Sequence, residues 1–242
     1  MPKGKENVFR EESEYDNPMD SKKEKRFLRG ALVLDILTAV FVAASMIWLF
    51  LGPDGSLLAH NMTAFRYFTV DSNVLLGVVA LIMIPLDVMA LKGKWEKLPR
   101  WAFLLLHAAT MSTNITMLTV LFFLGPTMGY GSMYAHSLLF LHLLSPLAGL
   151  ARYLFFSAKS ETMVWPLSML GAGPMILYGT IYVINVVAHN GYGDSNYDWY
   201  GFGSGGPGVA AFSAILMLML CLGGSIGYYF ARCGLIKALR LS

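Results

Sequence analysis

The chain has few charged residues for its length. Of its 242 residues, 14% are Asp, Glu, Lys or Arg, whereas 56% are apolar. A soluble domain carries about 25% charged residues, so this composition excludes an ordinary water-soluble fold. It is typical of a protein that lies in a membrane.

Several kinds of chemistry lack the residues that they need. Cys221 and Cys233 are separated by about 18 Å along one predicted helix, so they cannot pair within it. The five histidines form no His-x-x-x-His or Glu-x-x-His pair, so neither a metal nor another cofactor is expected. Three of them, His136, His142 and His189, meet only if the fold brings their helices together. No internal repeat predicts an inverted-repeat transporter.

The sequence does contain six long apolar runs. Each is near or above the roughly 20 residues that a membrane-spanning helix needs. The runs cover residues 30–52, 64–91, 101–125, 133–156, 166–188 and 208–232. We therefore predict an all-α membrane protein, with a six-transmembrane-helix bundle formed by residues 27–242. Short connections make consecutive helices antiparallel neighbours.

The basic residues are placed unevenly along this topology. If all six runs cross the membrane, 17 of the 18 Lys and Arg residues fall on the side that holds both termini. Cytoplasmic loops carry such an excess, so we predict a multi-pass protein of the cell membrane with both termini cytoplasmic. The basic residues serve topology in this interpretation, and no nucleic-acid binding is expected. Residues 1–26 mix acids and bases with few apolar residues, which predicts a partly disordered cytoplasmic tail.

Polar residues recur at helical spacing in three of the predicted helices. The sets are Arg66, Thr69 and Asn73 in the second helix, His107, Thr110 and Asn114 in the third, and Tyr178, Tyr182, Asn185 and His189 in the fifth. Polar groups are costly in hydrocarbon, so their placement is informative. Either they converge on a cavity closed toward the cytoplasm and open to the outer leaflet, or they form interhelical hydrogen bonds worth about 0.6 kcal/mol each.

The fourth and fifth helices carry further signals. His142 lies about nine residues from the outer end of the fourth helix, where a histidine between two leucines needs a partner and can exchange protons near neutral pH. Pro174 predicts a kink where the polar stripe of the fifth helix begins. Gly171 and Gly173 predict that a neighbouring helix approaches closely there.

Two acids and one loop lie near the ends of the predicted helices. We expect Asp35 and Asp87 to meet Lys or Arg at the inner membrane interface. The loop at residues 189–207 is rich in Gly and aromatic residues and has no Lys or Arg. Its aromatic residues, such as Trp199 and Tyr200, are expected to anchor the loop at the outer interface. The alternative is that they fold over the mouth of a pocket as a lid.

Helices two to five contain the segments FRYFTVDSNVLL (65–76), HLLSPLAGL (142–150) and PMILYGTIYVINVV (174–187), followed by DWYGF (198–202). In these segments the chain resembles the androgen-induced protein family and its bacterial six-helix relatives. It implies a multi-pass hydrolase that cleaves fatty acid esters of hydroxy fatty acids. It further implies a threonine nucleophile in an F-T motif, matched by Thr69, and a histidine shortly before a proline, matched by His142 and Pro146.

The implied chemistry is reasonable, because a threonine hydroxyl becomes a nucleophile when a nearby base takes its proton. The oxyanion donor would come from Asn73, Asn114 or Tyr182. Arg66 would bind a fatty acid carboxylate, or else reach the lipid head groups. The expected substrate-binding residues are Arg66, Asn73, Asn114, Tyr178, Tyr182 and Asn185.

The predicted function is thus hydrolysis of lipid esters, with membrane lipids and a fatty acyl substrate as partners. A non-catalytic lipid-binding or sensing protein would use the same cavity without a nucleophile. A small transporter would need a continuous polar path, and the sequence shows neither a ring of charges nor a repeat that predicts one.

Overall fold

The computed structural model describes residues 18–51, 61–94, 98–156 and 163–240. Within these residues the regular structure is helical, without strands. Six stretches are long and apolar enough to cross a membrane, namely Lys25–Leu51, Phe68–Leu91, Arg100–Met128, Ser137–Phe155, Trp165–Ala188 and Pro207–Ala238. The prediction of an all-α chain with six helices of membrane-spanning length is confirmed.

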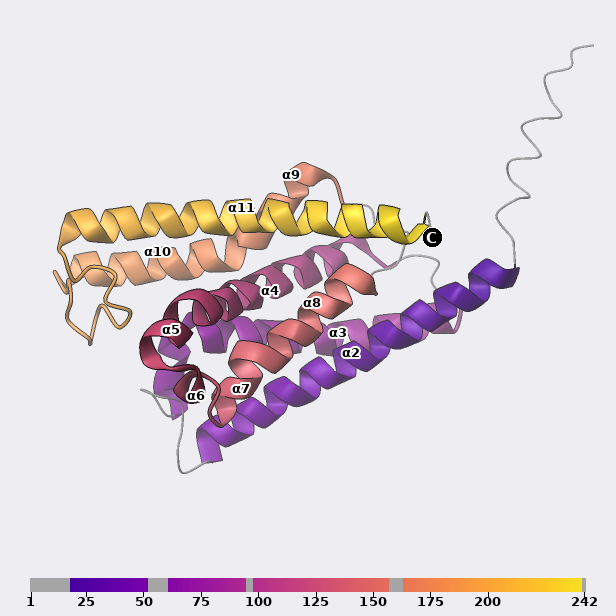
Figure 1. Cartoon of the computed structure of the whole chain (residues 1–242), viewed down its shortest axis with the longest axis horizontal. Coiled ribbons are helices and arrows are strands. Elements are labelled where there is room, and N and C mark those ends of the chain that lie inside the picture. Colours follow the sequence, from indigo (N-terminus) through magenta and orange to yellow (C-terminus); the bar gives the residue numbers. More distant parts are fainter. Residues whose placement is uncertain (1–17, 52–60, 95–97, 157–162, 241–242) are drawn as a thin grey trace, which may run out of the picture.

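The first and last helices extend beyond their predicted bounds. Helix α2 (Pro18–Leu51) includes the last part of the predicted tail, and residues 1–17 lie outside the described residues. Helix α11 (Pro207–Arg240) also runs past its predicted end. The start of α2 and the end of α11 lie at the same end of the bundle (Figure 1). We call this the inner end, and the opposite end the outer end, after the predicted orientation.

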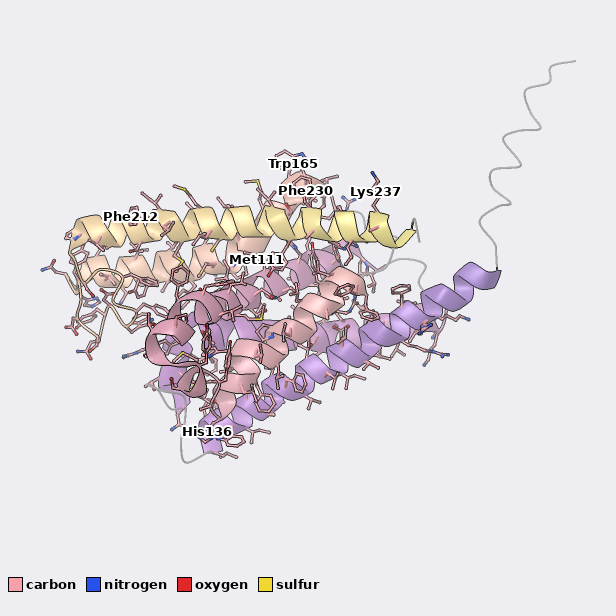
Figure 2. All side chains as sticks on the ribbon, viewed as in Figure 1. Met111, His136, Trp165, Phe212, Phe230 and Lys237 are labelled. Carbon is pink, nitrogen blue, oxygen red and sulfur yellow. The ribbon has the colours of Figure 1, made fainter. Side chains whose placement is uncertain are left out.

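Helix α4 (Arg100–Thr119) lies at the centre of the bundle, with α3 (Phe68–Leu91), α8 (Ser145–Phe155) and α11 packed against it. The most apolar stretch of α4 is 56% buried, whereas that of α11 is only 11% buried. Large apolar side chains cover the outward face of α11, including Phe212 and Phe230 (Figure 2). Such a face is expected to contact lipid, because a surface of this kind is rare in soluble proteins.

The second and third predicted helices contain breaks. The second begins as a 3-10 helix, η2 (Asn61–Arg66), and becomes α3 after Tyr67, which has an extended backbone. In the third, α4 continues through a π-helical turn, η3 (Val120–Leu124), into the short α5 (Gly125–Met128). Turns of this kind are frequent near functional sites.

The fourth and fifth predicted helices are more strongly interrupted. The fourth comprises α6 (Tyr130–Met133), α7 (Ser137–Leu139), the π-helical turn η4 (Phe140–Leu144) and α8. The fifth comprises α9 (Trp165–Ser168), the 3-10 helix η5 (Met169–Ala172) and α10 (Gly173–Ala188). Pro146 and Pro174 each stand in the first turn of the helix that follows a break, where a missing N–H is tolerated. The irregularity predicted at Pro174 is confirmed.

Three buried charges, which we call the Arg152 cluster, join α2, α3 and α8 near the inner end. Arg152 donates from Nε to Asp35 Oδ2 at 3.0 Å and from Nη2 to Asp87 Oδ1 at 3.2 Å. All three side chains are at most 2% exposed. The prediction that both acids meet a basic residue is confirmed, and the three side chains meet inside the bundle rather than on its surface. One guanidinium has enough donors in a planar fork to satisfy two carboxyl groups inside the bundle.

We expect Arg152→Met to lower the free energy of unfolding by about 3 to 5 kcal/mol, because it leaves two buried carboxyl groups without their shared partner. Adding Asp35→Asn and Asp87→Asn to this variant should recover most of the loss, since no charge then remains to be buried. Thermal unfolding of the purified protein in detergent measures both effects. Wild-type stability in the single variant would contradict a structural role for the cluster.

Candidate functional site

A cavity of about 510 Å³ lies in the outer half of the bundle. Its walls come from α4 with η3, from α10 and from α11, and its outer end is closed by the first turn of α3 and by residues 189–206, which we call the outer loop. The size falls within the range of about 300 to 1,000 Å³ that small-molecule sites occupy. Most lining side chains are apolar; the hydroxyl groups come from Thr69, Thr116, Thr119, Tyr178, Thr180, Tyr182, Tyr200 and Ser213.

The cavity is elongated along α10 and α11, and we call it the slot. On α11 its lining runs from Ala210 to Cys221, a stretch of about 16 Å at 1.5 Å per residue. Thr69 lies in the first turn of α3, which faces Tyr178 of α10, since the rings of Phe68 and Tyr178 are 5.1 Å apart. The buried Cys221 lies at the inner end. The hydroxyl groups of Thr69, Tyr178, Tyr182 and Tyr200 thus gather where α3 and the outer loop meet α10.

A group of buried polar residues, the His107 cluster, lies one helical turn inward from Cys221. His107 Nε2 lies 3.0 Å from the Ser168 carbonyl and 2.9 Å from Ser225 Oγ, and Ser225 Oγ donates to the same carbonyl at 2.5 Å. A Cβ at Gly171 would lie 2.2 Å from Ser225 Oγ. The prediction that a neighbouring helix approaches closely is therefore confirmed at Gly171. It is wrong at Gly173, where a Cβ would meet nothing within 4 Å.

The slot opens sideways between α10 and α11. Several lining side chains are well exposed, among them Ile184 (62%) on α10 and Ile215 (53%) on α11. Tyr178 lies about 120° round α10 from Ile184 and is held on the α3 side, because its hydroxyl donates to the Arg66 carbonyl just before α3. The exposed lining side chains of α10 and α11 therefore mark the open side of the slot. The opening is thus directed at the region that lipid fills in a membrane.

The outer loop folds over the outer end of the slot. Tyr200 Oη accepts a hydrogen bond of 2.8 Å from the Phe68 amide, the first of α3. Trp199 Nε1 donates to Tyr178 Oη at 3.0 Å, and the rings of Tyr200 and Phe202 stack at 5.2 Å. Burial raises the pKa of Tyr200 well above its usual value, so its hydroxyl is neutral. Tyr200 and Phe202 thus cover the slot as the lid alternative describes, held by partners on α3 and α10, while the anchor at the outer interface stays a prediction.

Asp198 fixes the conformation of the outer loop. One oxygen, Oδ1, accepts from the Tyr182 hydroxyl, and Oδ2 accepts from the amides of Gly193 and Gly203 at 2.8 Å each. Burial by itself would raise the pKa of Asp198, but the hydrogen bonds from Tyr182 and the two amides outweigh it and lower the pKa. The carboxylate therefore ties the loop to α10 in its ionised form.

The structure brings three of the eight predicted site residues into the slot. Those that line it are Thr69, Tyr178 and Tyr182. Those that do not are Arg66, Asn73, Asn114, His142 and Asn185. The side chain of Arg66 is exposed at the outer end, and Asn185 Nδ2 donates to the Tyr197 carbonyl at 3.0 Å and so holds the outer loop.

Two of the predicted asparagines bind the interrupted fourth span. Asn73 Nδ2 donates to the Leu141 carbonyl at 2.9 Å, and Asn114 Nδ2 donates to the Pro146 carbonyl at 3.3 Å. Both side chains are buried. Their amide N–H groups donate to carbonyls at the π-helical turn and at the proline. Of the two roles predicted for the polar residues, these two asparagines therefore have the second, hydrogen bonding between helices. The expectation that they supply oxyanion donors is wrong in this geometry.

His142 is buried close to Thr69 but outside the slot. Its Nδ1 lies 2.7 Å from the Met133 carbonyl. A carbonyl only accepts, so Nδ1 donates and the neutral ring keeps its lone pair on Nε2. Asn73 Nδ2 bonds the carbonyls of both Thr69 and Leu141, which places these two oxygens within about 6 Å of each other. Among the described contacts, no hydrogen bond joins Thr69 directly to His142.

The sequence interpretation missed the sixth helix as a wall of the slot. A signal was present, because Ala210, Ser213 and Ala214 have the i, i+3, i+4 spacing of one helix face. Small residues on one face let a neighbour or a ligand come close.

In the described part of the chain, no three His, Cys, Asp or Glu side chains gather to hold a metal ion. Comparisons with protein-family models, curated proteins and solved structures found no match.

We expect Asp198→Asn to lower the free energy of closing the outer loop by about 2 kcal/mol, because hydrogen bonds to a charged acceptor are stronger than neutral ones. The folded pKa of Asp198 lies below its ordinary value of 3.8. The stabilisation is therefore full above that value and is lost as the pH falls through the folded pKa. Hydrogen exchange of the Gly193 and Gly203 amides measures both effects. Asp194→Asn, at an exposed acid of the same loop, is the control, and equal exchange in the two variants would contradict this role.

Proposed function

We propose that the protein is an intramembrane hydrolase of lipid esters, with Thr69 as the nucleophile. The observation that carries the proposal is that the Thr69 side chain lines a mostly apolar slot, at the end where α3 and the outer loop meet α10. An acyl chain that lies in the slot toward Cys221 brings its ester group to this end. The opening between α10 and α11 lets such a molecule enter from the bilayer.

The proposed reaction begins with attack of Thr69 Oγ1 on the ester carbonyl carbon. The threonine proton passes to His142 Nε2 through one bridging water, and then to the alcohol oxygen as its bond to the acyl group breaks. A second water hydrolyses the acyl-threonine and returns the proton to the hydroxyl. What supports His142 in this role is its Nδ1 bond to Met133 and the short distance between the two backbone segments.

The proposed oxyanion donor is the Phe68 amide. It stands next to Thr69 at the first turn of α3, where helix N–H groups have no partner within the helix. In this structure it donates to Tyr200 Oη of the outer loop. An ester carbonyl oxygen can replace that hydroxyl as the acceptor when the lid moves, and a preorganised amide of this kind stabilises developing negative charge.

A second candidate function is lipid binding without turnover. It is favoured by the absence of a direct hydrogen bond between Thr69 and His142 among the described contacts, and by the aromatic side chains of Tyr200 and Phe202 that line the slot. A protein that senses or stores an acyl lipid needs the slot but no nucleophile. Measurements on Thr69 variants separate the two functions.

We expect Thr69→Ala to lower ester turnover by at least about 1,000-fold, because it removes the attacking oxygen. Thr69→Ser should keep a measurable part of the activity. Thr119→Ala is the matched control, since it removes a hydroxyl from another wall of the same slot and should have little effect. Hydrolysis of a long-chain ester by the purified protein in detergent is the measurement. Full activity of Thr69→Ala would exclude the threonine mechanism.

We further expect a fluorophosphonate probe to label Thr69, and His142→Gln to slow this labelling by about 100-fold, because glutamine can keep a donor for Met133 but cannot accept a proton. Peptide mapping identifies the labelled residue. Ser225 is a necessary comparison, since its Oγ lies 2.9 Å from His107 Nε2. Labelling at Ser225 in place of Thr69, or no labelling with lipid still bound, would contradict the proposed mechanism.

A further inference from the structure

We infer that the slot selects lipids by charge, because the buried carboxylate of Asp198 lies directly behind its wall and disfavours an anion inside it. The ligands that the slot takes are uncharged esters or lipids with a positive charge, whereas fatty acid anions are excluded. This inference rests on the proposed binding of lipid in the slot and names its substrate class, but it does not depend on catalysis.

The wall of the slot offers no positive charge. Of the described residues that line it, none is Asp, Glu, Lys, Arg or His. The two tyrosine hydroxyls on α10 are already committed, that of Tyr178 to the Arg66 carbonyl and that of Tyr182 to Asp198. Arg66, the basic residue just before α3, has an exposed side chain and does not line the slot. A carboxylate in the slot therefore meets no ion-pair partner among the described lining residues.

Asp198 stands one layer behind this wall and touches it from two sides. Its Oδ1 accepts from the Tyr182 hydroxyl and its Oδ2 from the Gly203 amide at 2.8 Å, and both of these residues line the slot. A Cβ at Gly203 would lie 2.9 Å from Asp198 Oδ2 and 3.6 Å from the Cβ of Ala210, a lining residue of α11. Less than about 7 Å thus separates this oxygen from the α11 wall, a distance over which charges interact strongly inside a protein.

The charge of Asp198 is balanced by no cation among its described contacts. Its hydrogen bonds come from neutral groups, the Tyr182 hydroxyl and the amides of Gly193 and Gly203. These bonds lower its pKa and keep it ionised. The residue is only 2% exposed, so salt screens its charge little. Asp71, in the first turn of α3, also acts electrostatically on Tyr178 of the wall, and its charge has the same sign.

The expected selectivity follows from Coulomb's law. At an effective dielectric constant of about 20, a unit charge about 10 Å from Asp198 has its binding constant changed by more than about tenfold. An ester has no net charge and is not affected. The acid that hydrolysis releases gives its proton to water near neutral pH, and the resulting anion is disfavoured. The slot thus holds the ester and releases the acid.

The experiment compares probes that share one tail and differ in the charge of the head group. The full-length protein in an uncharged detergent is incubated with dodecanol, dodecyltrimethylammonium and dodecanesulfonate, none of which contains an ester bond. The probes that remain bound after purification are extracted and measured by mass spectrometry. We expect dodecanesulfonate to be retained at least about tenfold less than either of the other two. Equal retention of the anion and the cation would overturn the inference.

Four variants assign the effect to Asp198. Asp198→Asn removes the charge and should lower the ratio of retained cation to retained anion by at least about fivefold. Ala210→Lys brings a cation close to Gly203 without removing any hydrogen bond of Asp198, and it should lower the ratio in the same direction. Asp194→Asn, at an exposed acid of the same loop, and Ala210→Met, which adds similar bulk without charge, are the controls. Both controls should keep the wild-type ratio.

The outcomes separate this inference from the proposed catalysis. A wild-type ratio in folded Asp198→Asn protein would overturn the inference, and if that variant does not fold, a wild-type ratio in Ala210→Lys would do so. Ester turnover without charge selection would contradict only this inference. Charge selection in a protein that hydrolyses no ester would contradict only the proposed catalysis.

Discussion

The structure depends on a constraint that the bilayer imposes: polar side chains inside it must find their partners within the protein. The Arg152 cluster meets this constraint at the inner end by joining α2, α3 and α8 with side chains that are at most 2% exposed. The His107 cluster does the same for α4, η5 and α11. At the outer end, the side-chain hydrogen bonds of Tyr178, Tyr182 and Asn185 join α10 to the outer loop and to the segment before α3. The helices are thus held closely at one end, and space remains at the other.

The polar residues divide into two groups with different roles. Asn73 and Asn114 donate hydrogen bonds to carbonyls around the π-helical turn η4, so they hold an interrupted helix in place. Thr69, Tyr178 and Tyr182 instead line the slot, and the two tyrosines also bind the lid or the segment before α3. The same outer-half side chains therefore build the closed end of the slot and supply its polar surface.

Much of this arrangement follows from local rules. The six spans could be predicted because bilayer thickness sets helix length, and the shared face of Tyr178 and Tyr182 follows from helix periodicity. The position of His142 could not, because a π-helical turn departs from the 100° per residue that such reasoning assumes. The shared arginine of Asp35 and Asp87 depends on tertiary packing between three helices. The lid could be named only as an alternative, since the partners of Trp199 and Tyr200 are distant in sequence.

The central claim is that a single acyl chain lies in the slot with its polar end at Thr69. An experimental structure of the full chain in lipid nanodiscs tests this most directly. The account predicts elongated density between α10 and α11, from Thr69 beneath the outer loop down to Cys221. Density that ends elsewhere, or α10 and α11 packed together with their side chains filling the space, would contradict it.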